Sequence, residues 1–201
     1  MTKNLKQILL LGVLAAVSIA IGLWAGMQGQ SKPSKGPSYA DLGGDFTLTS
    51  DQGPVSLHDL RGKVVPIFFG FTACPDVCPT ALTALSAALK KLSDEERAQV
   101  QPLFISIDPE RDDPQRVGEY VRYFHPSVIG LSGTLDEVSR VAKQYLVIFE
   151  KVPLGDSTMG YTMDHSAIVY VVGKDGVIDS LVHHGETPDD IAAALREALA
   201  R

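Results

Sequence analysis

The sequence has no excess of basic charge and very little cysteine. Its 18 Lys and Arg residues are outnumbered by 24 Asp and Glu residues, which gives a formal net charge of −6. Because binding to phosphates requires a concentrated basic surface, this balance argues against a nucleic-acid partner. We find no internal repeat. Both cysteines lie far from the N-terminus, which excludes a lipid-modified cysteine at the start of a mature chain.

A long uncharged run stands out near the N-terminus. Residues 8–27 are almost entirely apolar, and a helix of about 20 residues rises about 30 Å, enough to cross the hydrocarbon core of a bilayer. Lys3 and Lys6 precede the run, as expected for a cytoplasmic N-terminus, although two lysines also follow it. The alternative is a cleaved secretory signal with a small-residue site at 18–20. Either interpretation places the bulk of the protein outside the cytoplasm, in the bacterial periplasm or an equivalent compartment.

The apolar run divides the chain into three regions. Residues 28–38 contain Gln, Ser, Lys, Gly and Pro without an apolar cluster, a composition typical of a flexible tether. We therefore predict a membrane anchor over 1–27, a tether over 28–38 and a single folded domain over 39–201. The domain has roughly 160 residues, enough for one hydrophobic core.

The pattern of the domain predicts an α/β fold. The apolar run at 64–69 is typical of a strand buried on both faces, although Pro66 gives up a ladder hydrogen bond. Asp113 before a proline and Thr134 in a capping box mark two helix starts. The elements alternate as a mixed sheet flanked by helices, which is compatible with a thioredoxin-like fold. We expect a hairpin at 45–57, strands at 64–69, 100–107, 145–152, 167–172 and 177–182, and helices at 80–92, 114–124, 134–144 and 188–199.

The two cysteines, Cys74 and Cys78, fall where the buried strand ends and the next helix begins. The free N–H groups and partial positive charge of a helix N-terminus favour thiolate, the form that binds metal or attacks a disulfide. A spacing of four residues places both sulfurs on one side of a helical turn, about 6 Å apart along the axis. The pair can serve as a structural disulfide, a catalytic dithiol or a metal site.

The residues alone favour the metal site and leave the other two interpretations open. A disulfide would close a loop of only a few residues and therefore stabilise little. The thioredoxin-type dithiol has two residues between its cysteines, whereas this chain has three. A third ligand is needed to decide.

Three blocks of sequence resemble the SCO/SenC family of copper chaperones, which act in cytochrome c oxidase assembly. Residues 69–79, FGFTACPDVCP, are similar to that family's cysteine motif almost letter for letter. Residues 106–114, SIDPERDDP, resemble its second block, and residues 161–166, YTMDHS, resemble the block that carries its histidine ligand. Together with the predicted anchor, the similarity spans nearly the whole chain.

The resemblance implies a thioredoxin-like fold and a copper site formed by Cys74, Cys78 and His165, with His165 on a loop that enters a central strand. It implies one copper per chain, as Cu(I) or Cu(II), delivered to the binuclear copper site of a cytochrome c oxidase subunit. Another copper chaperone is a candidate donor. The alternative function is a membrane-anchored thiol–disulfide reductase that acts on the recipient's cysteines. A peroxiredoxin-like peroxidase is a more distant alternative.

The chemistry of these side chains agrees with copper. Cu(I) prefers soft thiolates and Cu(II) is satisfied by imidazole, so two cysteines and one histidine can hold either state. Structural zinc usually takes a fourth protein ligand, and none is evident. The stretch from 154 to 172 also contains no proline, whereas a thioredoxin oxidoreductase resembling this pattern would carry a cis-proline there.

Seven other residues have side chains that metal sites use: His58, His125, His183, His184, Met159, Met163 and Asp76. We expect the first two histidines in loops and the adjacent pair at the surface. The two methionines precede His165 in what we expect to be a long loop. Packing of the loop is the favoured explanation, and a transient role in copper transfer is the alternative, because thioethers suit Cu(I). Asp76 lies between the cysteines and serves either as a cap or turn residue or as a group that tunes the thiols.

Overall fold

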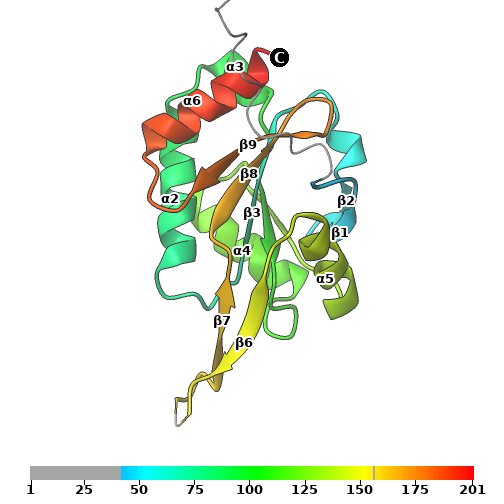
Figure 1. Ribbon diagram of the computed structural model, residues 1–201, viewed down its shortest axis with the longest axis vertical. Coiled ribbons are helices and arrows are strands. Elements are labelled where there is room, and N and C mark those ends of the chain that lie inside the picture. Colours follow the sequence, from blue (N-terminus) through cyan, green and yellow to red (C-terminus); the bar gives the residue numbers. More distant parts are fainter. Residues whose placement is uncertain (1–41, 156) are drawn as a thin grey trace, which may run out of the picture. The chain divides into compact units, whose positions relative to one another are not determined.

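The computed structural model describes residues 42–155 and 157–201. The predicted anchor over 1–27 and the predicted tether over 28–38 lie outside these described residues. Within the described part, no helix is both long and apolar enough to cross a membrane. The structure therefore concerns the predicted folded domain, whose elements are labelled in Figure 1.

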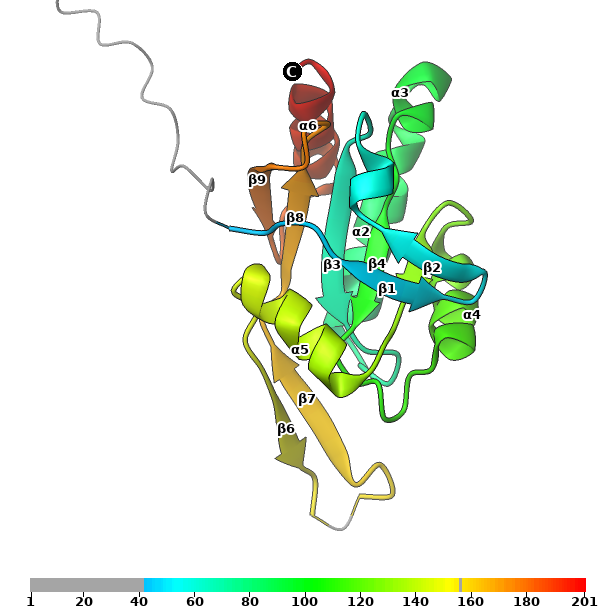
Figure 2. The ribbon, with the colours of Figure 1, turned by 90° about the vertical axis from the view of Figure 1, so that its right-hand side faces the viewer.

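A five-stranded mixed sheet forms the centre of the domain (Figures 1 and 2). In spatial order its strands are β5 (Ile129–Leu131), β4 (Leu103–Ser106), β3 (Val65–Gly70), β8 (Ile168–Val172) and β9 (Ile178–His183). Strands β3, β4 and β5 run parallel, while β8 is antiparallel to both of its neighbours. Every residue of β3 is buried, as its apolar run predicts. Pro66 fits this central strand because the ladder to β4 begins one residue later, at Ile67.

Helices cover both faces of the sheet. One face carries α2 (Val77–Lys90), α4 (Pro114–Phe124) and α6 (Pro188–Leu199). The other carries α5 (Leu135–Gln144) and the hairpin of β1 (Thr47–Ser50) and β2 (Gly53–Ser56), as Figure 2 shows. This arrangement agrees with the predicted mixed sheet flanked by helices.

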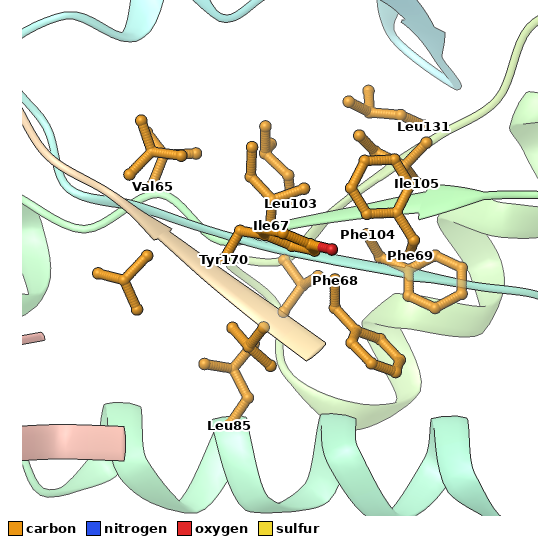
Figure 3. Close-up of a cluster of buried hydrophobic side chains, with 14 of the residues drawn as sticks. Val65, Ile67, Phe68, Phe69, Leu85, Leu103, Phe104, Ile105, Leu131 and Tyr170 are labelled. Atoms are coloured by element: carbon orange, nitrogen blue, oxygen red, sulfur yellow. The ribbon is translucent and has the colours of Figure 1, made fainter. Parts of the chain in front are cut away.

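Neighbouring aromatic residues of β3 serve opposite faces because successive side chains of a strand alternate. Phe68 packs against Phe104, with ring centroids 6.1 Å apart, on the side of α2 and Leu85 (Figure 3). Phe69 packs against Tyr145 and Tyr170 on the α5 side, with centroids 5.6 and 5.8 Å away. A fully buried phenylalanine contributes about 1.5–3 kcal/mol to stability, so β3 anchors both layers.

Helix starts agree with the capping signals in the sequence. The Thr134 hydroxyl accepts from the backbone N–H of Glu137, whose side chain returns the bond, so the predicted capping box is confirmed. Asp113 caps α4 in the predicted manner, by accepting from the N–H of Arg116. The helix predicted to begin at residue 80 begins earlier, at Val77, and therefore includes Cys78.

Four short elements were absent from the prediction: the 3-10 helix η1 (His58–Leu60), α3 (Asp94–Ala98), β5, and β7 (Tyr161–His165). The prediction of a strand over 145–152 was wrong at its start, because Tyr145 ends α5 and the strand β6 spans Phe149–Pro153. Strands β6 and β7 pair with each other in a separate two-stranded sheet. Both are largely exposed or half-buried, so neither shows the alternation that identifies a strand.

Candidate metal centre

The cysteines sit at the junction of β3 and α2. The chain leaves β3 at Gly70, turns, and enters α2 at Val77. Cys74 lies in the connecting loop and is half-buried, whereas Cys78 is in the first turn of the helix and fully buried. The backbone N–H of Cys78 donates to the Cys74 sulfur over 3.4 Å. Both cysteines are free thiols, so the pair is available as ligands or as a dithiol.

His165 reaches the cysteines from the end of β7. Its Nε2 lies 3.6 Å from the Cys78 sulfur, and its Nδ1 lies 3.1 Å from the carbonyl oxygen of Ser166. A carbonyl only accepts, so Nδ1–H donates to it and the lone pair of Nε2 faces the sulfurs. This second contact fixes both the tautomer and the ring orientation that a metal ligand needs.

Two aromatic rings hold the imidazole in place. Phe68 and Phe71 meet it edge to face, with centroids 6.1 and 6.0 Å from that of His165. Both rings are buried, so the imidazole has little freedom to rotate. Neither phenylalanine carries a signal in the sequence beyond its apolar character.

The three donor atoms form a compact set. The sulfurs of Cys74 and Cys78 and a ring nitrogen of His165 all lie within 4.8 Å of one another. Among the described residues, this is the only group of three or more His, Cys, Asp or Glu side chains close enough to share a metal ion. Two of the three residues, Cys74 and His165, line a cavity of about 230 Å³, together with Phe71, Pro75, Asp76, Val77, Thr162, Met163, Asp164 and Ala167.

The two thiols have opposite acidities. The pKa of Cys74 is lowered from 9.0 to about 3, chiefly because the Cys78 thiol donates a hydrogen bond to that sulfur. The pKa of Cys78 is raised, first by the same hydrogen bond and then by burial. Cys74 is therefore a thiolate at neutral pH beside a protonated Cys78. Soft sulfur donors of this kind, with one imidazole, fit a copper ion.

Residues 34–200 match the family described as SCO1/SenC. This chain belongs to that family. The SCO1 homolog 1 of Arabidopsis thaliana, a mitochondrial protein, is 42% identical over 160 residues, which cover 73% of this chain and 47% of the relative. The chain thus spans about half the length of the first curated relatives it matches.

Solved structures of SCO proteins share the fold. A crystal structure of Arabidopsis thaliana ScoI with copper bound is 38% identical, has a TM-score of 0.73, and covers 79% of this chain and 98% of its own. The structure of Bradyrhizobium japonicum ScoI with copper bound is 42% identical, has a TM-score of 0.71, and covers 79% and 99%. The predicted SCO family and its mixed α/β fold are confirmed.

The secondary structure around His165 differs from the prediction. His165 is the last residue of β7, not part of a loop, and the chain enters the central strand β8 three residues later. Met163 also lies in β7 and is buried, so it packs as predicted but in a strand; Met159 is exposed.

The remaining polar candidates lie around the site or away from it. Asp76 lines the metal cavity and stands at the N-cap of α2 without a capping bond from its side chain. His183 and His184 are exposed and line a separate cavity of about 180 Å³. His58 belongs to a short 3-10 helix rather than a loop, and His125 follows α4.

Proposed function

We propose that this chain is a copper chaperone that delivers copper to the binuclear copper site of a cytochrome c oxidase subunit. The observation that carries the proposal is the set of three soft or borderline donors, from Cys74, Cys78 and His165, within 4.8 Å of one another, two of which line one cavity. Two SCO structures with copper bound support it, at 38% and 42% identity.

Three protein ligands suit a carrier better than a permanent store. Two thiolates and one imidazole together hold copper as Cu(I) or as Cu(II), so one copper per chain is bound by the same three ligands in either state. An open coordination position allows a ligand of the recipient to enter before a ligand of the carrier leaves. Cys74 and His165 line the cavity that provides this access.

The location follows from the sequence in this proposal. A single N-terminal helix over 1–27 anchors the chain, and the tether over 28–38 lets the domain reach an oxidase subunit in the same membrane. The domain lies outside the cytoplasm, in the periplasm or an equivalent compartment. A second copper chaperone supplies the metal, and nucleic acid has no part because the surface charge is acidic overall.

Copper affinity of the reduced full-length protein tests the site. We expect one Cu(I) per chain in anaerobic competition with a chelator, and a loss of at least about tenfold, or about 1.4 kcal/mol, in His165→Ala. His184→Ala, an exposed histidine beside a different cavity, is the matched control and should bind as the wild type does. Equal Cu(I) affinity in wild type and His165→Ala would remove His165 from the Cu(I) site.

Delivery has its own experiment. Copper-loaded protein is mixed with the metal-free copper domain of an oxidase subunit, and the two are separated and assayed for copper. We expect copper in the recipient and reduced, metal-free donor. Copper that stays on this chain at equilibrium would leave a copper-binding protein and reject its role as a donor to that recipient.

A thiol–disulfide reductase is the second candidate, because the two cysteines have the asymmetry that such exchange uses. Cys74 is a half-buried thiolate, and Cys78 is a buried thiol beside it. The Cys74 thiolate attacks the recipient's disulfide and releases one recipient thiolate. Cys78 then loses its proton and attacks the mixed disulfide, which leaves a Cys74–Cys78 disulfide and a fully reduced recipient.

The two functions differ in their need for histidine. Reduction of an oxidised recipient requires both cysteines, so we expect Cys78→Ser to stop at the mixed disulfide. His165→Ala retains the dithiol and should still reduce the recipient. A protein that reduces the recipient but delivers no copper would make reductase the function.

A further inference from the structure

One short segment is bonded to both halves of the metal centre. The segment, residues 107–113, connects β4 to α4 and is called here the joining segment. It passes beside the cysteine loop, since Ile107 N–H donates to the Gly70 carbonyl at 2.8 Å. Two of its carboxyl groups, those of Asp108 and Asp112, are buried. Asp112 faces the half of the site that carries the two cysteines, and Asp108 faces the half that carries His165.

Asp112 holds the cysteine half. Its carboxylate accepts from the backbone N–H of Thr72 at 2.8 Å, from the Thr72 hydroxyl at 2.5 Å and from the Ser106 hydroxyl at 2.7 Å. Thr72 stands two residues before Cys74, in the loop that connects β3 to α2. Arg116 adds a donor to the Thr72 hydroxyl at 3.0 Å. The position of the loop is therefore set from one fully buried carboxylate.

Asp108 and Arg111 hold the histidine half. The Tyr161 hydroxyl donates to the Asp108 carboxylate at 2.7 Å, and Arg111 pairs with the same carboxylate. Arg111 also donates to the Tyr161 carbonyl at 3.0 Å and lies over its ring, 3.8 Å from the centroid. Tyr161 is the first residue of β7, and His165 is the last.

The hairpin that carries His165 needs such an anchor. Within the part of the chain that the structure describes, strands β6 and β7 pair only with each other, and a lone two-stranded hairpin is marginally stable in water. A second contact supports its other strand, where the Lys151 ammonium lies 2.5 Å from the Glu110 carboxylate of the joining segment. Both strands of the hairpin are thus attached to the same few residues.

We propose that Asp112 and Asp108, the latter through Arg111 and Tyr161, are positioning residues that set the distance between the cysteine pair and the histidine. The proposal rests on the proposed copper site. Ligands that come from segments 87 residues apart must be held near their bound geometry before the metal arrives. The joining segment does this because it is bonded to both.

The energetics favour a geometric role for these acids. Taking a carboxylate out of water is costly, and a buried polar network often adds less stability than apolar packing of the same volume. Asp108 and Asp112 are 1% and 0% exposed, and five donors from side chains or backbone satisfy their carboxylates. Hydrogen bonds and ion pairs are directional, so they fix the positions of the groups that they join more closely than apolar contacts do.

Two nearly isosteric variants separate the halves. Tyr161→Phe removes the hydroxyl that reaches Asp108, and Thr72→Val removes the hydroxyl that reaches Asp112. We expect each to weaken Cu(I) binding by about tenfold, the low end for the loss of an outer contact at a metal site. In a His165→Ala background, Tyr161→Phe should lower the Cu(I) affinity by less than about twofold, because it acts only through the histidine. Thr72→Val should lower the Cu(I) affinity in that background by the same factor as in the wild type.

Tyr145→Phe is the control, since it removes the hydroxyl bond of a different tyrosine, to the Gly44 carbonyl at 3.3 Å, and should leave copper binding unchanged. Tyr161→Phe with wild-type affinity, or with an equal loss in the His165→Ala background, would overturn the proposal while the copper site itself stands. A wild type that binds no copper would reject the proposed function instead.

A metal-free measurement decides the proposal in every case. We expect the NMR signals of the His165 ring in the reduced protein to shift or broaden in Tyr161→Phe and to stay unchanged in Tyr145→Phe. Ring signals identical to those of the wild type in Tyr161→Phe would show that Asp108 does not position the histidine.

Discussion

The sulfur of Cys78 lies directly against the backbone of Gly70. A Cβ atom built on this glycine would be 2.8 Å from that sulfur and 2.8 Å from the Phe104 ring. Real Cβ atoms essentially never approach so closely. The end of β3 therefore has to be glycine for the first turn of α2 to place its thiol toward His165.

Gly70→Ala should damage both stability and the metal site. The added methyl group must displace the buried sulfur or the buried ring, and overpacking of this kind costs about 1–3 kcal/mol. If Cys78 moves away, its distance to His165 changes as well. We expect a lower midpoint in denaturant unfolding, and weaker Cu(I) binding measured under conditions where the variant is fully folded.

Gly130→Ala provides the matched comparison. A Cβ on this glycine of β5 would lie 2.8 Å from the backbone of Val117, so the variant is overpacked to a similar degree but in a different part of the sheet. We expect it to be destabilised and to bind copper normally once folded. A similar loss of copper binding in both variants would mean that stability alone, rather than the Cys78 position, governs affinity.

The reactivity of the two cysteines should differ strongly. Cys74 is a half-buried thiolate, while Cys78 is buried and protonated, so iodoacetamide should modify Cys74 first in the reduced, metal-free protein. Because the pKa of Cys74 is about 3, its alkylation rate should stay constant as the pH falls from 9.0 through neutrality. Peptide mass spectrometry after timed quenching measures both rates.

Two substitutions at position 78 check the cause of this reactivity. Cys78→Ala removes the proton donor that contributes most to the low pKa of Cys74. The pKa of Cys74 should therefore rise in this variant, and alkylation of Cys74 should slow in mildly acidic buffer. Cys78→Ser keeps a hydrogen-bond donor at the same place, so alkylation of Cys74 should slow less in this variant than in Cys78→Ala. Identical profiles for the two variants would assign the acidity of Cys74 to another group.

The three residues that the structure brings together, Cys74, Cys78 and His165, could be singled out from the sequence because they lie in compact motifs. Cys74 and Cys78 share one turn at the end of a strongly apolar strand, and His165 lies in a six-residue block that resembles the family's. The helix caps at Asp113 and Thr134 were equally local signals, since each bond spans three residues. Patterns within a few residues of one another are visible in a single sequence.

The supports of the site could not be predicted for the opposite reason. Asp112 and Thr72 are 40 residues apart, and Asp108 and Tyr161 are 53 apart, so nothing local links them. Within the charged stretch 108–113, only Asp113 has a local signal in the sequence, as the cap of the helix that follows. Strand β7 was read as a loop because its sheet has just two strands and little burial.

The acidities of the thiols also predict how copper affinity depends on pH. Metal binding requires both cysteines as thiolates. Cys74 has already lost its proton at neutral pH, because its pKa is lowered to about 3, whereas Cys78 still holds one because its pKa is raised. Binding of Cu(I) should therefore release about one proton from the thiols, and affinity should rise about tenfold for each unit of pH.

Chelator competition at several pH values across the neutral range measures this slope, with the chelator's own protonation subtracted. His165→Ala serves as the reference, since it removes any proton contributed by the imidazole. In Cys78→Ser, where only Cys74 remains as a thiol, the slope should fall toward zero because no thiol proton is left to displace. If the logarithm of the affinity rises with a slope near two per pH unit in the His165→Ala protein, both thiols are protonated before copper binds. That result would contradict the assignment of Cys74 as a thiolate at neutral pH.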